Sequence, residues 1–246
     1  MKGSACSGEE KEKGLGMRIL AMGAHPDDLE IFCYGLLAAC KDRGDELHLA
    51  VATDGAAGAV AGQDKTLAER RAAETKLALS NLSAPVLLGL PDGVLSGTPS
   101  GRQVVYDHIS NVAPDLILTH APEDYHTDHR ALSSWVTELA GFNCPVLYAD
   151  TLMGVGFVPD YYVDITNWQA EKRAAILAHT SQMPERFADG AALLNRFRAA
   201  QCNAPEGHYA EAYRSAARFP FSDIRAMIPP PPPYRPYYVS GAEGFL

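Results

Sequence analysis

The sequence lacks any run of about 20 consecutive apolar residues, the length that a helix needs to cross the hydrocarbon core of a bilayer. Its first residues, MKGSACSGEEKEKGLG, are polar and charged and lack the apolar centre of a secretory signal. The five cysteines are odd in number and contain no CxxC pair, so neither a disulfide framework nor a zinc ribbon is indicated. These absences predict a cytoplasmic protein with reduced thiols and no integral membrane association.

Basic runs are also missing. The chain has 21 Lys and Arg against 30 Asp and Glu, a net charge of −9, which argues against nucleic acid or an anionic membrane as the main partner. A small-molecule partner is favoured instead. A globular chain of 246 residues buries roughly 70 to 75% of its unfolded surface, so it needs no metal merely to fold. Any metal site would therefore indicate function.

Three common catalytic loops are absent from the sequence. There is no GxSxG elbow of a serine hydrolase and no GxxxxGK[ST] loop of a nucleoside triphosphatase. The turn after the first apolar run, MGAHP, lacks GxGxxG and places a proline where backbone amides would bind a pyrophosphate. Dinucleotide binding is therefore not expected.

Short apolar runs alternate with segments of helical composition, as in βα units that build a parallel sheet. Strands are expected at residues 17–23, 46–53, 86–90, 115–119 and 146–149, and helices at residues 28–42, 67–79, 102–112 and 127–139. This order predicts a Rossmann-like three-layer α/β/α fold with a mostly parallel sheet and the strand order 3-2-1-4-5.

The pattern becomes less regular after residue 161. A strand at 162–165 and helices at 168–179 and 185–200 are expected to form an irregular C-terminal cap. We expect residues 1–16 to be a disordered extension, with Met17 as an alternative start, and residues 17–218 to form a single domain. The Pro-rich tail, residues 219–246, is expected to pack on this domain or on a neighbouring subunit, which is compatible with a homo-oligomer.

Two polar clusters follow the first and fourth expected strands. The first is AHPDDLE at residues 24–30, and the second is HAPEDYHTDH at residues 120–129. These strands are neighbours in the expected order, so the clusters should face each other at the carboxyl edge of the sheet, where ligands bind in such folds. Each cluster alone could be a capped strand-to-helix turn. Together they can supply the imidazole and carboxylate ligands of one metal ion, with a position open for water.

These residues resemble the PIG-L/LmbE-like family of metal-dependent de-N-acetylases. AHPDDLE fits the AHPDDxE signature of the family, and DYHTDHR at residues 124–130 fits its HxDH signature. Weaker matches lie at residues 53–55, 71 and 74, 90–93, 179–182 and 209–213. The likeness spans about residues 17–214.

The resemblance implies one metal ion per chain, usually zinc, although another divalent ion is compatible. The implied metal ligands are His25, Asp28 and His129. Asp27 would be the general base, and His126 would stabilise the oxyanion or act as an acid, with Asp128 orienting its ring.

Four further residues are candidate contacts to the sugar or its acyl group: Arg71, Asp92, His179 and Gln182. Two of them have plain structural alternatives. Arg71 could form a surface ion pair with Glu74, and His179 could simply end a helix.

The activity that this resemblance implies is hydrolytic removal of an N-acetyl or other acyl group from an N-acetylglucosamine-like amino sugar or glycoconjugate. A metal-dependent hydratase or lyase on a small unsaturated acid is the second hypothesis. A metal-binding or sugar-binding module without turnover is the third, but no base or ligand is missing from the motifs.

Overall fold

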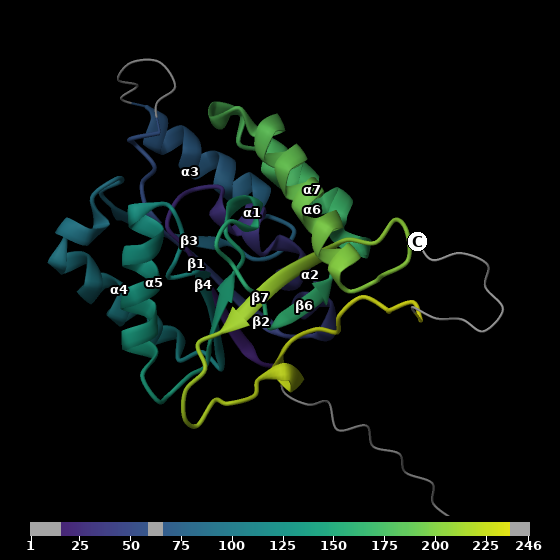
Figure 1. The fold of residues 1–246 in the computed structure, drawn as a ribbon. Helices are drawn as coiled ribbons and strands as arrows, with labels where there is room; N and C mark the ends of the chain where they lie inside the picture. The colour runs from purple at the N-terminus through teal and green to yellow at the C-terminus, as the bar shows by residue number, and fades with distance from the viewer. Residues whose placement is uncertain (1–15, 59–65, 237–246) are drawn as a thin grey trace, which may run out of the picture.

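The computed structural model describes residues 16–58 and 66–236, which are built around a seven-stranded sheet (Figure 1). The strand order is β3-β2-β1-β4-β5-β7-β6, and the five strands from β3 to β5 are parallel. The strands are β1 (Arg18–Gly23), β2 (Glu46–Thr53), β3 (Pro85–Leu90), β4 (Leu116–His120), β5 (Val146–Ala149), β6 (Tyr161–Asp164) and β7 (Ala210–Ser215). The expected order of the first five strands is confirmed.

Helices cover both faces of the sheet (Figure 1). They are α1 (Asp28–Phe32), α2 (Tyr34–Arg43), α3 (Leu67–Ala78), α4 (Pro99–Val112), α5 (Thr127–Ala140), α6 (Gln169–Leu177) and α7 (Pro184–Gln201). In β1, Ile19 and Ala21 join the core beneath α1 and α2, whereas Leu20 and Met22 join the core beneath α4 and α5. Because both faces are buried, the strand is an unbroken apolar run rather than an alternating one. The three-layer α/β/α fold is confirmed.

The single helix expected at residues 28–42 is two helices that meet at Cys33. The break leaves the first N–H groups of α2 free to be capped from elsewhere. The carboxylate of Glu211, on β7, accepts hydrogen bonds from the backbone N–H groups of Gly35 at 2.9 Å and Leu36 at 2.8 Å. A side chain at position 35 would collide with Ile165, since an added Cβ would lie 2.3 Å from its Cγ2 atom. The kink is therefore imposed by tertiary contacts.

The segment after residue 161 is part of the main layers rather than a separate cap. Strand β7 pairs antiparallel with both β5 and β6 and so extends the central sheet. In the tail, Ile224 and Ile228 enter the hydrophobic core, and the carbonyl of Pro230 accepts a hydrogen bond from the N–H of Asp164. The expectation for residues 1–16 lies almost wholly outside the described residues. Over residues 16–58 and 66–236, none of the helices has both the length and the apolar character needed to span a bilayer.

Candidate metal centre

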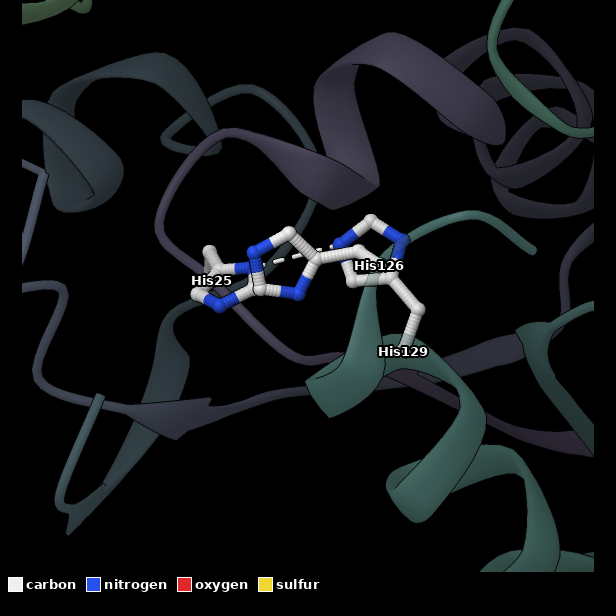
Figure 2. Close-up of side chains that lie close together, drawn as sticks. All are labelled: His25, His126 and His129. Atoms are coloured by element: carbon white, nitrogen blue, oxygen red, sulfur yellow. Dashed lines mark hydrogen bonds between the residues drawn. The ribbon is translucent and has the colours of Figure 1, made fainter. Parts of the chain in front are cut away.

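The two polar clusters meet at the carboxyl edge of the sheet. Strands β1 and β4 are hydrogen-bonded neighbours, with Ala21 paired to Leu118, so the segments that follow them emerge side by side. His25 lies in the turn after β1, whereas His126 and His129 lie at the start of α5. Figure 2 shows the three imidazole rings gathered at this point. The juxtaposition expected from the strand order is present.

The donor atoms of His25, Asp28 and His129 lie close together. The Nδ1 atom of His25 lies 3.1 Å from Nε2 of His129 and 3.5 Å from Oδ2 of Asp28. The same His129 nitrogen lies 3.3 Å from Oδ1 of Asp28. Ligands at about 2.0 to 2.1 Å from a tetrahedral zinc ion would lie about 3.3 Å from one another. These separations of 3.1 to 3.5 Å are therefore compatible with a small tetrahedral cation.

Further carboxylates surround the opposite edge of the His25 ring. Its Nε2 atom lies 3.1 Å from Oδ1 of Asp92 and 3.3 Å from Oδ2 of Asp128. Burial opposes protonation of His25, but hydrogen bonds with Asp128, Asp28 and Asp92 raise its pKa to about 12. This concentration of negative charge would equally attract a metal cation.

Asp27 precedes α1 in an unusual backbone conformation, with φ 115° and ψ −21°. A positive φ costs a residue with a side chain about 1 to 3 kcal/mol, and such strain is typical of functional sites. Its Oδ2 atom lies 3.2 Å from Nη2 of Arg71. Burial raises the pKa of Asp27, the guanidinium of Arg71 opposes the rise, and the pKa is about 7. A carboxylate with this pKa can accept and return a proton near neutral pH.

His126 is the N-cap of α5, and its Nδ1 atom accepts a hydrogen bond from the backbone N–H of Asp128 at 3.2 Å. The neutral ring then carries its proton on Nε2. Burial lowers the pKa of His126, and the neighbouring His25 and His129 lower it further. His126 is therefore suited to donate a hydrogen bond as a neutral imidazole.

The expected role of Asp128 toward His126 is wrong. Within residues 16–58 and 66–236, its carboxylate makes no hydrogen bond to the His126 ring. It accepts from the backbone N–H groups of Gly93 at 2.7 Å and Leu95 at 3.0 Å, and it faces His25. The motif places Asp128 in the first turn of α5, where its side chain turns toward the loop after β3 while its N–H reaches back to the N-cap.

A cavity of about 270 Å³ opens over these groups. Its walls include the candidate metal ligands and the predicted polar contacts Arg71, Asp92 and Gln182. Apolar and aromatic side chains complete much of the lining: Ile31, Phe32, Tyr125, Leu152 and Phe187. His179 is not among the described residues that line it. Its ring is 1% exposed, and its Nε2 atom lies 2.9 Å from Oε1 of Glu30.

Arg71 and Glu74 are buried rather than paired on the surface. The Arg71 guanidinium donates to the carbonyls of Gly55 at 3.0 Å and Pro26 at 2.5 Å, so it joins the loop after β2 to the first motif. The carboxylate of Glu74 accepts from Thr180 and Ser181, which positions the turn that carries Gln182. The surface ion-pair alternative is wrong because both side chains face inward from α3.

Two neighbours of the candidate metal ligands received no role from the sequence. His120, the last residue of β4, stacks on His129 with ring centroids 3.8 Å apart, and its Nε2 atom lies 3.1 Å from Oδ2 of Asp28. Asp124 lies against the other edge of the His129 ring. Both belong to the second polar cluster, which begins at the end of β4. That position was the signal in the sequence that could have identified them.

The part of the chain that carries both motifs is also the part that matches a known family. Residues 20–140, which carry both motifs, match the PIG-L family, described as GlcNAc-PI de-N-acetylase. The chain is 29% identical over 189 residues to the diacetylchitobiose deacetylase of Thermococcus kodakarensis, covering 68% of this chain and 71% of that protein. The chain therefore contains a PIG-L family domain over residues 20–140.

Solved structures share the fold at lower identity. The N,N'-diacetylchitobiose deacetylase of Pyrococcus horikoshii superimposes with a TM-score of 0.70 at 22% identity, covering 81% of this chain and 83% of that one. The 4-carboxy-2-hydroxymuconate hydratase GalB of Pseudomonas putida superimposes with a TM-score of 0.67 at 18% identity, covering 85% and 99%. One fold therefore serves both a deacetylase and a hydratase.

Proposed function

We propose that the chain is a divalent metal-dependent hydrolase, with zinc as the preferred ion, that removes an N-acetyl group from an N-acetylglucosamine-like amino sugar or glycoconjugate. The observation that carries the proposal is the convergence of His25, Asp28 and His129 on one point beside Asp27, in the wall of a cavity. The motifs of the family coincide with this arrangement.

Amide hydrolysis needs an activated water, a stabilised oxyanion and a protonated leaving nitrogen. A divalent ion held by His25, Asp28 and His129 would make water more acidic and polarise the acyl carbonyl. Asp27, with a pKa of about 7, would take the proton of the attacking water and then carry it to the departing nitrogen. Arg71 holds the Asp27 carboxylate at the cavity wall.

His126 would stabilise the negative charge that develops on the acyl oxygen. Because its Nδ1 atom is occupied by a backbone N–H, the proton of the neutral ring lies on Nε2 and is available for donation. Loss of one such donor commonly lowers kcat by about 100- to 1,000-fold.

The sugar would occupy the part of the cavity beside Arg71, Asp92 and Gln182. The cavity volume of about 270 Å³ is close to the lower limit of about 300 Å³ for pockets that hold small ligands, which suits a single sugar residue. The relative named above as a diacetylchitobiose deacetylase acts, by that name, on an acetylated amino-sugar compound, which supports this substrate class.

The test is release of free amine from a panel of N-acetylated amino sugars by the purified, zinc-loaded protein. Asp27→Asn should retain bound zinc and lose at least about 100-fold in kcat, because the base is removed while the ligands remain. Zinc content and amine release measured on the same samples check this. A zinc-loaded Asp27→Asn protein with full activity would contradict the role of Asp27. Turnover of a small unsaturated acid, with no amine released from any sugar, would instead support a hydratase.

A further inference from the structure

The carboxylate of Asp124 is buried against the edge of His129 that faces away from the proposed metal position. Its Oδ1 atom lies 3.1 Å from Nδ1 of His129, and the residues are 1% and 3% exposed. The other ring nitrogen of His129, Nε2, is the atom that faces His25 and Asp28. The ring thus lies between a carboxylate and the converging ligands.

The polar atoms in this contact have few other hydrogen-bond partners among the described residues. Among the described residues, the buried Oδ2 atom of Asp124 has no hydrogen-bond partner. The Nδ1 atom of His129 makes no well-aligned hydrogen bond to any described residue, although it lies within ion-pair distance of Oδ1 of Asp124. A buried carboxylate that lacked this ionic contact would be costly to keep.

We propose that Asp124 is a positioning residue for metal binding: it accepts the Nδ1 proton of His129 and so leaves the Nε2 lone pair free for the ion. Metal-binding histidines commonly donate their second N–H to a carboxylate, which fixes both the tautomer and the ring orientation. The inference rests on the proposed metal dependence. It adds a residue outside the cavity lining, since Asp124 is not among the described residues that form those walls.

Asp124 also has a local structural role that the test must separate from this one. Its Oδ1 atom accepts a hydrogen bond from the N–H of His126 at 2.9 Å, which forms a turn before α5. Asp223 forms the same turn elsewhere, with its Oδ1 atom 2.9 Å from the N–H of Arg225, but it is exposed. Asp223 is therefore a matched control for the turn alone.

The experiment compares zinc affinity by chelator competition in the wild type, Asp124→Ser and Asp223→Ser. A serine hydroxyl can retain the turn but is too short to reach His129. We expect Asp124→Ser to bind zinc about 10- to 100-fold more weakly and to recover activity at saturating zinc, with an altered visible spectrum when Co²⁺ replaces zinc. Asp223→Ser should match the wild type in affinity and spectrum.

Asp124→Ser with wild-type zinc affinity would overturn the inference and leave the proposed hydrolase intact. A wild type that binds no zinc or Co²⁺ would overturn the metal site itself. If circular dichroism shows that Asp124→Ser does not fold, Asp124→Thr decides the question, because threonine also has a hydroxyl that can form the turn and is too short to reach His129. Wild-type affinity together with an unchanged Co²⁺ spectrum in Asp124→Thr would then overturn the inference.

Discussion

In His25 and His126 of the candidate metal centre, one ring nitrogen is engaged by the protein, and this determines which nitrogen remains for chemistry. In His25, the Nε2 atom faces Asp92 and Asp128, which leaves Nδ1 toward the proposed metal position. In His126, the Nδ1 atom accepts a backbone N–H, which leaves the proton on Nε2. A motif fixes the spacing of such residues but does not specify these partners.

The buried pair of His179 and Glu30 predicts a pH-dependent contribution to stability. Burial lowers the pKa of His179, but the hydrogen bond with Glu30 outweighs it, so the pKa is raised. A raised folded-state pKa stabilises the protein fully below the unfolded value of about 6.5, and the contribution is lost as the pH rises through the folded value.

We expect His179→Gln to destabilise the protein most below about pH 6.5 and progressively less at alkaline pH, because the charged form of His179 is the one that Glu30 favours. Urea unfolding of the wild type and the variant across this pH range measures the difference. A difference in unfolding free energy that stays constant with pH would show that His179 contributes only packing.

At the scale of elements, Glu211 joins strand β7 to the start of α2. Besides capping two N–H groups of α2, its carboxylate lies 2.7 Å from Nζ of Lys172 on α6 and accepts from the hydroxyl of Tyr213 at 2.6 Å. Lys172 and Glu211 are 1% and 2% exposed. Three elements that are far apart in sequence are thus held by one carboxylate.

Glu211→Gln should destabilise the protein by about 3 to 5 kcal/mol, because it leaves the charge of Lys172 buried without a partner. The exposed Glu206 offers a control, since Glu206→Gln should change the free energy of unfolding by no more than about 0.5 kcal/mol. Chemical unfolding curves measure both values. Equal values for the two variants would contradict a special role for Glu211.

At the scale of the molecule, the proposed metal would connect two segments about a hundred residues apart. His25 and Asp28 follow β1, whereas His129 lies in α5. An ion that binds only the folded state stabilises it by about 2.7 kcal/mol at 100 times its dissociation constant. Metal binding should therefore raise the melting temperature of the protein.

Zinc should raise the melting temperature of the wild type, and a chelator should reverse the rise. His25→Ala and His129→Ala should show almost no rise because each lacks one metal ligand, whereas Asp27→Asn should show the full rise. Differential scanning calorimetry with and without zinc checks this series. A full rise in both histidine variants would place the metal elsewhere.

Sequence alone predicted the layers of the fold and the juxtaposition of the two polar clusters. The boundaries of β2 and β5 follow directly from apolar runs that are buried on both faces. The cluster at the ends of β1 and β4 follows from strand order, because neighbouring parallel strands end at one edge of the sheet. The choice of His25, Asp28 and His129 as metal ligands came from the resemblance of the motifs to a known family, and it stays a prediction.

Only the tertiary structure decided the partners of these side chains. The split between α1 and α2 depends on Glu211, about 175 residues away along the chain. The first four residues of β7 are all buried, so exposure does not alternate along this strand. The inward positions of Arg71 and Glu74, and the turn of Asp128 toward His25, depend on which backbone groups lie nearby in space. Local sequence encodes helix and strand preference and residue spacing, whereas long-range packing sets hydrogen-bond partners, burial and pKa.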